Sequence, residues 1–172
     1  MFRQATLGDL AAICRIYDAI HTEEEAGHTT IGWIRTIYPT ESTARQAIEL
    51  GDMFVEQDQG QLVACGRINR EQVDCYKEGA WRNAACDEQV MVLHTLVVDP
   101  AVSRKGYGEK FLQFYESYAR EHGCPYLRLD TNARNIRARA FYQKHGYWEV
   151  GTVPCEFNGI AGVNLVLLEK KL

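Results

Sequence analysis

The sequence lacks the marks of several protein classes. No apolar run is long enough to span a membrane. No signal peptide is visible either, because Met1-Phe2-Arg3-Gln4 leads straight into an amphipathic segment. The six cysteines include no Cys-x-x-Cys pair, which removes the closely spaced ligands that a structural zinc site needs. These absences favour a cytoplasmic protein with reduced thiols, no bound metal and no membrane partner.

A basic excess is absent as well. The 19 Lys and Arg residues are outnumbered by 23 Asp and Glu residues, which gives a net charge of −4 at pH 7. Nucleic-acid-binding domains are usually strongly basic, so we expect no nucleic-acid partner. Repeats, low-complexity tracts and linkers are also missing. Because 172 residues suit one domain, we expect residues 1–172 to form a single domain.

Hydrophobic periodicity predicts a mixed α/β domain built in layers, of the α+β kind. Asp130-Thr131-Asn132 reads as the exit loop of the strand before it, and a loop at 153–158 separates the last two strands. The predicted elements are strand 2–5, helices 10–20 and 40–50, strands 53–57, 62–68 and 90–98, helix 107–119, strand 126–129, helix 135–144, and strands 147–150 and 163–168.

The most informative segment runs from His94 to Gly108, HTLVVDPAVSRKGYG. It predicts a buried strand followed by a glycine turn that opens a helix. Unpaired N–H groups at such a helix start favour an anion, most often a phosphate. The turn has neither the Walker A pattern nor a dinucleotide fingerprint, since Phe111 stands where the third glycine belongs. A tight turn that only packs a helix on the sheet is the alternative explanation.

Two motifs together resemble those of the GNAT superfamily of acyl-CoA-dependent N-acetyltransferases. The phosphate-binding signature, Arg/Gln-x-x-Gly-x-Gly/Ala, matches SRKGYG at 103–108, except that Ser103 stands where Arg or Gln is usual. The second signature matches NIRARAFYQKHGY at 135–147, in the family's order and spacing. The resemblance implies the GNAT fold over almost the whole chain, with a mixed central sheet of about six to seven strands and helices on both faces.

The resemblance implies transfer of an acetyl group from acetyl-CoA to a primary amine by direct attack. We expect a small-molecule amine as the acceptor, with protein N-termini and lysines as alternatives. A non-catalytic acyl-CoA-binding or regulatory module is the alternative from another class, since a fold does not establish a function. Exposed strand edges near the C-terminus also allow a homodimer.

The resemblance assigns a cofactor site as well. Amides of the glycine turn cradle the pyrophosphate of CoA, and the buried strand holds the pantetheine arm as an added strand would be held. Because Ser103 replaces the usual side-chain cap, we expect weakened CoA binding. One of Arg134, Arg137 and Arg139 is expected to meet the 3′-phosphate, with simple solvent exposure as the alternative for each. The implied cofactor residues are Leu96, Val97, Val98, Ser103, Arg104, Lys105, Gly106, Tyr107, Gly108, Glu109, Asn135, Arg137 and Tyr142.

Tyr142 is the implied catalytic acid. In the family, the tyrosine at this motif position protonates the departing CoA sulfur. A phenol has a pKa of about 10, close enough to that of an alkyl thiol to share a proton with it. A core aromatic packed beside Phe141 is the alternative role for this side chain.

His94 is the first candidate for the base. Strand alternation predicts His94, Leu96 and Val98 on one face, and an imidazole with a pKa of about 6.5 relays a proton well at neutral pH. In one member of the superfamily a histidine at the similar position removes the proton. A histidine hydrogen-bonded to a backbone carbonyl is the alternative. Glu88, acting through water, is the second candidate.

The acceptor site is expected between the first two helices, in the segment 26–39. Trp33 and Tyr38 are candidates to hold a cationic or aromatic amine, and His28 lies in the same segment. Burial of two aromatic side chains under a loop is the alternative explanation. The loop at 153–158 is expected to close the site from the other side.

Overall fold

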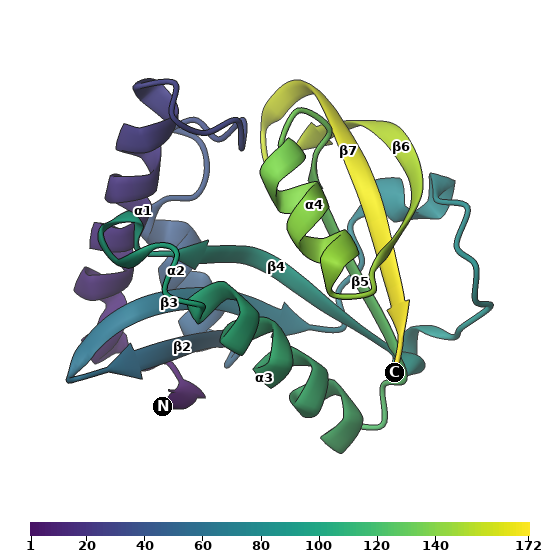
Figure 1. The fold of residues 1–172 in the computed structure, drawn as a ribbon, viewed down its shortest axis with the longest axis horizontal. Coiled ribbons are helices and arrows are strands. Elements are labelled where there is room, and N and C mark those ends of the chain that lie inside the picture. The colour runs from purple at the N-terminus through teal and green to yellow at the C-terminus, as the bar shows by residue number, and fades with distance from the viewer.

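A central sheet of seven strands organises the computed structural model, which describes residues 1–172 (Figure 1). The order of strands and helices is the predicted one, with short 3₁₀ turns added between them. No helix is long and apolar enough to cross a membrane. The elements are β1 (Phe2–Gln4), α1 (Leu10–Glu25), α2 (Glu41–Glu49), β2 (Met53–Asp58), β3 (Gln61–Asn69), β4 (Val90–Val98), α3 (Tyr107–Glu121), β5 (Tyr126–Asn132), α4 (Ile136–Lys144), β6 (Trp148–Phe157) and β7 (Ile160–Lys171).

The strands lie in the order β1-β2-β3-β4-β5-β7-β6, and only β4 and β5 run parallel. Helices α3 and α4 cover one face of the sheet, whereas α1, α2 and the segment 70–89 cover the other (Figure 1). The predicted mixed sheet with helices on both faces is therefore confirmed. Strand β6 forms one edge of the sheet, and the homodimer expected from exposed edges stays a prediction.

Apolar layers on both faces hold the helices against the sheet. Phe111 and Tyr115 of α3 are fully buried in a cluster that includes Leu127 of β5. On the other face, Ile13 of α1 is fully buried in a cluster that includes Val97 of β4. Burial of one such side chain contributes about 1.5–3 kcal/mol. Strand β4 is consequently held from both faces, and the groups at its C-terminal end are fixed in place.

Strands β4 and β5 pair over only part of their length. Val90, Met91 and Val92 of β4 face Tyr126–Arg128 of β5, and the ladder ends there. Beyond it the two strands diverge, as the ribbon shows (Figure 1). The remaining backbone groups on these facing edges have no strand partner, although buried backbone groups normally find one. The sheet is therefore split at its centre.

A bulge interrupts β4 at Thr95. His94 pairs with Arg67 of β3, but Val97 pairs with Cys65, so β4 carries one more residue than β3 between these positions. Thr95 has a φ of 53°, which is rare for a β-branched residue and common at bulges. Residues on either side of the bulge that would share a face in a regular strand therefore lie on opposite faces.

The ends of the last three strands differ from the predicted ones. Asp130-Thr131-Asn132 continues β5 and pairs with Leu165–Leu167 of β7, so the expected exit loop is wrong. Strands β6 and β7 are longer than predicted: residues 153–157 of the expected loop belong to β6, and the turn is confined to Asn158-Gly159, so the loop expected at 153–158 is wrong. Pro154 reads as a strand breaker, but it lies on the edge strand β6, where a missing N–H is tolerated.

A buried ion pair fastens the segment 70–89 to the sheet. Arg128 of β5 and Glu169 of β7 are 6% and 1% exposed, and their charged groups lie 3.6 Å apart. Glu169 Oε2 accepts hydrogen bonds from the Arg82 N–H (3.0 Å) and from Asn83 (3.1 Å), and the Arg128 guanidinium stacks on Trp81. These contacts hold residues 81–83 against the sheet, and the Trp81 indole N–H donates to the Tyr76 carbonyl at 2.7 Å, which links the turn Asp74–Glu78 to them.

Candidate functional site

The glycine turn opens α3 as predicted. Gly106 has a φ of 82°, and the first intrahelical bond runs from Lys110 N to Gly106 O at 3.0 Å. The N–H groups of Tyr107, Gly108 and Glu109 precede that bond and have no acceptor within the helix. Gly106 offers no side chain to cap them. Together with the helix dipole, these free donors make a site for an anion.

A cleft of about 440 Å³, here named the turn cleft, extends from this helix start along α4. Of the implied cofactor residues, Val97 and Lys105 are absent from its lining, because Val97 packs into the core beneath α1 and Lys105 points to solvent. The structure brings the others together along one surface: Leu96, Val98, Ser103, Arg104, Gly106, Tyr107, Gly108, Glu109, Asn135, Arg137 and Tyr142.

The turn cleft carries more positive than negative charge. Arg104, Arg137 and Lys144 line it, with Glu109 as the only acidic residue of the lining. Arg139 is not available to a ligand there, because both its Nε and Nη2 donate to Glu149 at 2.7 and 2.9 Å. The charge balance suits a ligand with several negative groups.

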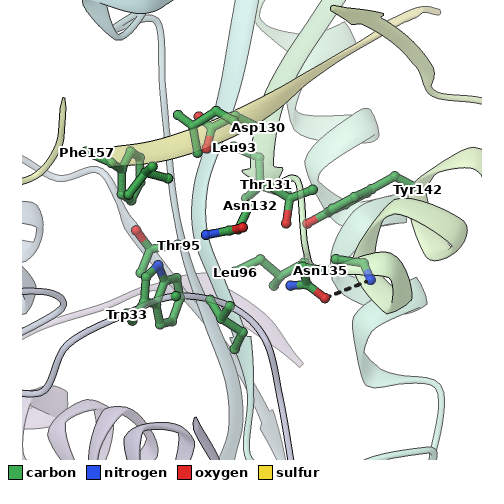
Figure 2. A pocket seen from close by; sticks show the side chains of 15 residues that line it. Trp33, Leu93, Thr95, Leu96, Asp130, Thr131, Asn132, Asn135, Tyr142 and Phe157 are labelled. Atoms are coloured by element: carbon green, nitrogen blue, oxygen red, sulfur yellow. Dashed lines mark hydrogen bonds between the residues drawn. The ribbon is translucent and has the colours of Figure 1, made fainter. Parts of the chain in front are cut away.

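A second, smaller cavity of about 100 Å³ lies in the split between β4 and β5; we name it the inner cavity. Its side chains converge from β4, β5, α4, the β6–β7 hairpin and the α1–α2 loop (Figure 2). Asn135 Oδ1 accepts from the Ala138 N–H at 3.1 Å and thereby caps α4, which fixes the helix start at the cavity wall. The polar lining residues are Thr95, Asp130, Thr131, Asn132, Asn135 and Tyr142.

Tyr142 lies where the turn cleft and the inner cavity meet. It lines both, and its side chain points from α4 into the cavity (Figure 2). The residue is 8% exposed, and its hydroxyl makes no hydrogen bond within the protein. Burial raises the pKa of Tyr142, with a smaller contribution from the nearby Asp130. The phenol therefore stays protonated at neutral pH and is free to donate.

A third hollow of about 510 Å³, the outer hollow, opens between β7 and the α1–α2 loop. Its border with the inner cavity, which we call the neck, is formed by residues that line both. The loop at the neck is fixed by Glu24, whose carboxylate accepts from the N–H groups of Ile31 and Gly32 at 2.8 Å each. The neck residues are Gly32, Trp33, Asn132 and Val163.

The predicted acceptor residues fall in different places. Trp33 lines the inner cavity and the outer hollow. Tyr38 is buried beneath them, where its hydroxyl is hydrogen-bonded to Thr95 and supports the bulge. His28 lines the turn cleft instead, with its Nδ1 3.0 Å from Glu23. From the segment 153–158, Phe157 lines the inner cavity.

The base candidates are not placed as the sequence suggested. Because of the bulge, His94 faces away from Leu96 and Val98, so the expectation of one shared face is wrong. Its Nε2 lies 3.0 Å from the side-chain oxygen of Asn69. Burial, together with the nearby Arg67, lowers the pKa of His94 to about 4. The base role predicted for His94 consequently has no support from the geometry.

Glu88 is also distant from the inner cavity. It is exposed, and it lies in the 3₁₀ turn Asp87–Gln89 that precedes β4. The length of β4 separates it from Leu96, which corresponds to roughly 25 Å of extended chain. A single bridging water is too short to connect the two.

Sequence reasoning overlooked three residues of the inner cavity, Asp130, Thr131 and Asn132. Their polarity made them read as a loop, although they end a buried strand. The sequence did contain a signal for Asp130: a carboxylate directly after the apolar residues of a strand that has a parallel neighbour. Ligand sites are common at the carboxyl ends of such strands. Asp130 Oδ2 accepts a hydrogen bond from the Tyr76 hydroxyl at 2.8 Å.

A helix start with free N–H donors, at the opening of a split sheet, is the arrangement expected of a protein that binds a phosphorylated ligand. The model of the acetyltransferase (GNAT) family matches residues 12–147. The chain therefore belongs to the acetyltransferase (GNAT) family. Among curated proteins, the uncharacterized N-acetyltransferase YhfO of Bacillus subtilis is 34% identical over 62 residues, which cover 36% of this chain and 42% of YhfO.

The matched segments span between 42% and 57% of the lengths of the curated relatives, all from Bacillus subtilis. Solved structures match the whole chain. A GNAT acetyltransferase from Streptococcus agalactiae gives a TM-score of 0.83 at 22% identity, covering 100% of this chain and 95% of that one. This likeness confirms the GNAT fold.

The names of two further structures differ in the acceptor. One is a ribosomal-protein-alanine N-acetyltransferase from Brucella melitensis, with a TM-score of 0.71, 22% identity, and coverage of 100% of this chain and 99% of that one. The other is a phosphinothricin N-acetyltransferase, so described provisionally, with a TM-score of 0.69, 19% identity, and coverage of 100% and 98%. At these identities the comparison shows the fold alone, and the acceptor of this chain has to be argued from its own site.

Proposed function

We propose that the protein transfers an acetyl group from acetyl-CoA to the primary amine of a small molecule by direct attack. One observation carries the proposal: the inner cavity shares lining residues with the turn cleft on one side and with the outer hollow on the other. A donor held in the cleft and an acceptor held in the hollow therefore meet in the split sheet, with Tyr142 at the meeting point. Holding two reactants in this way supplies much of the rate enhancement of a bimolecular reaction.

The residues of the turn cleft fit acetyl-CoA. A Cβ added to Gly108 would lie 3.6 Å from Phe141 and 3.7 Å from Val98, both of which line the cleft, so the missing side chain leaves space within the cleft. The free amides at the start of α3 suit the pyrophosphate. The unpaired edge of β4 at Leu96 and Val98 suits the amide groups of the pantetheine arm. Arg137 and Lys144 are the cations available for the 3′-phosphate.

When bound, acetyl-CoA supplies a thioester, and transfer forms an N–C bond, breaks the C–S bond, removes a proton from the amine and returns one to the sulfur. The chain must therefore provide a proton donor on the side of the turn cleft. Tyr142 is suited to that task, because its hydroxyl is protonated, lacks a protein partner and borders both spaces. The free N–H groups on the β4 edge would donate to the thioester carbonyl oxygen, which is the kind of stabilisation that acyl transfer needs.

The neck favours a small acceptor over a protein. The acceptor has to pass between the side chains of Trp33, Asn132 and Val163. Gly32, which has no side chain, leaves this passage open. The outer hollow beyond it is bordered by the α1–α2 loop and the β6–β7 hairpin and is open to solvent on its outer side. A protein N-terminus could reach the neck only as an extended segment. A protein acceptor and a purely regulatory acyl-CoA-binding module are the alternative outcomes of the test.

The test is turnover of acetyl-CoA with a panel of small primary amines and N-terminal peptides, followed as released thiol. We expect acetylation of small amines, and Tyr142→Phe is expected to lower kcat by about 10²–10³-fold with coenzyme A affinity unchanged. Tyr118→Phe, a partly buried tyrosine of α3 that packs on Phe54, is the matched control and should retain activity. Binding of coenzyme A without turnover of any amine would contradict the proposal, and turnover confined to peptides would replace the acceptor class.

A further inference from the structure

The inner cavity holds a carboxylate that the proposed acetyl transfer has not yet used. Asp130 lines the inner cavity but not the turn cleft. It lies on the same face of β5 as Asn132, two residues further along, which lines the neck. The carboxylate is therefore on the side from which the acceptor enters. Figure 2 shows it above Asn132 and across the cavity from Leu96.

One carboxylate oxygen of Asp130 is held and the other is free. Oδ2 accepts the hydrogen bond from the Tyr76 hydroxyl at 2.8 Å, which is the only hydrogen bond that the Asp130 side chain makes. Oδ1 has no partner in the protein. Asp130 is only partly buried and lies at the wall of the inner cavity, so its free oxygen is accessible to a ligand group.

No cation of the protein neutralises this carboxylate. The titratable side chains that face it are Tyr76 and Cys75 from the turn Asp74–Glu78, Tyr38 from the α1–α2 loop and Tyr142 from α4. Burial raises the pKa of Tyr38 and of Cys75 to about 12, and it raises the pKa of Tyr76 and Tyr142 as well. All four are therefore neutral at neutral pH. The Asp130 carboxylate is partly buried and has no counter-charge from the protein, and a bound ammonium group would supply one.

The size of the cavity limits the acceptor. At about 100 Å³ the inner cavity is the narrower of the two spaces on the acceptor side. The ammonium group and the carbons next to it would lie in this narrower space, beside Asp130. A branched carbon next to the nitrogen would have to pass Trp33 and Asn132 at the neck. The outer hollow is about five times larger and takes the rest of the acceptor.

We propose that Asp130 binds the ammonium group of the acceptor and takes the proton that the amine must lose, and that the acceptor is a primary amine on an unbranched stem. The inference rests on the acetyl transfer proposed above. One ammonium proton passes to Asp130 Oδ1, the electron pair of the broken N–H bond stays on nitrogen, and the carboxylate becomes a neutral carboxylic acid. Tyr76 is a positioning residue that keeps Oδ1 toward the cavity.

The proton affinity of Asp130 agrees with this role. Burial raises the pKa of Asp130 to about 6, against the lesser opposing effect of the Tyr76 hydrogen bond. The group is thus ionised at neutral pH and ready to accept a proton, and a base works best when its pKa lies near the working pH.

The first experiment measures amine binding by calorimetry without acetyl-CoA, at about pH 7.5. n-Butylamine, sec-butylamine and tert-butylamine have the same composition and differ only in branching. We expect affinity to fall in that order, and Asp130→Asn to weaken n-butylamine binding by about tenfold or more. Asp74→Asn is the control, because it removes the same charge from an exposed position on the turn that carries Tyr76. Its affinity should stay within about twofold of the parent's.

The second experiment uses the unaltered protein and needs no folded variant. The carboxyl ¹³C signal of Asp130, assigned through the backbone, is titrated with and without n-butylamine. Because a bound ammonium favours the ionised form, the pKa should fall by about one unit or more when the amine is present. A pKa that does not move would overturn the proposal. So would equal amine affinity of Asp130→Asn and the parent, equal affinity for the three isomers, or no binding at all.

These outcomes are separable from those of the proposed acetyl transfer. Binding that depends on Asp130, without acetylation of any amine, would reject the transfer and leave the ammonium site standing. Acetylation of amines that persists unchanged in a folded Asp130→Asn variant would reject the role of Asp130 and leave the transfer standing.

Discussion

Gly32 and Asn132 approach each other so closely that a side chain on Gly32 has no room. A Cβ built on Gly32 would overlap the amide nitrogen of Asn132, and the backbone φ of 82° is one that L side chains rarely adopt. The contact joins the loop after α1 to the end of β5, two segments far apart in the sequence. It sets the width of the neck between the inner cavity and the outer hollow.

Gly32→Ala is accordingly expected to displace Asn132 and narrow the neck. We expect the KM for the acceptor to rise about tenfold or more and the free energy of unfolding to fall by about 1–3 kcal/mol. Gly27→Ala is the matched control: it has a similar φ of 75°, but no atom lies within 4 Å of its Cβ. Gly27→Ala introduces the same backbone strain without a steric clash. An equal rise in KM for both variants would therefore show that the neck does not select the acceptor.

Gly108→Ala separates ligand binding from stability. Its added Cβ meets only ordinary contacts with Phe141 and Val98, so unfolding should change by less than about 1 kcal/mol. The same methyl group enters the turn cleft, and we expect coenzyme A to bind about tenfold or more weakly in a calorimetric titration. Gly8→Ala, which also has ordinary backbone angles and a nearest contact of 3.5 Å, should change neither quantity.

Ionisation of Asp130 should make the ligand-free protein less stable as the pH rises. Its pKa of about 6 lies above the unfolded value of 3.8, so the folded state is favoured fully below pH 3.8 and loses that advantage as the pH rises through 6. The loss amounts to about 3 kcal/mol between about pH 4 and pH 7. Asp130→Asn does not titrate, and its stability relative to the parent should grow by this amount in urea unfolding over that range. A constant difference would mean that the carboxyl is not perturbed.

The pair Arg128–Glu169 should contribute far more to stability than the less deeply buried pair Arg139–Glu149. Glu169→Gln leaves the guanidinium of Arg128 buried without its counter-charge, and we expect a loss of about 3 kcal/mol in the free energy of unfolding. Glu149→Gln breaks a pair whose side chains are 29% and 22% exposed, for a loss of about 1 kcal/mol or less. Chemical denaturation of both variants gives the comparison, and equal losses would refute the assigned importance of burial.

The fold was largely predictable because its elements follow local hydrophobic patterns. The apolar run of β4 and the i, i+3, i+4 spacing of Phe111, Phe114 and Tyr115 in α3 each indicate one structure. The ends of β5 and β6 were not predictable in the same way. Asp130 and Pro154 carry strong loop signals, and only pairing with β7 overrides those local preferences.

The lining of the candidate site was predictable near the glycine turn, because motif spacing places those residues at one helix start. The lining on the acceptor side was not predictable. A single extra residue at Thr95 places His94 and Leu96 on opposite faces of β4. Hydrophobic periodicity does not reveal this bulge, which is supported by the hydrogen bond between the Tyr38 and Thr95 hydroxyls. Asp130 enters the cavity through long-range strand pairing and the Tyr76 contact, which the chain order does not disclose.

Only three residue pairs of a single ladder join β4 to β5, so the sheet consists of two ribbons with a short common seam. Amides in β1–β4 and in β5–β7 are then protected by separate sets of hydrogen bonds. The two ribbons can therefore open independently, so that their amide hydrogens exchange with solvent at different rates. A ligand lying along the seam bridges both ribbons and couples their opening. Native-state hydrogen exchange should therefore report two protection levels in the free protein and one common level when the cleft is filled.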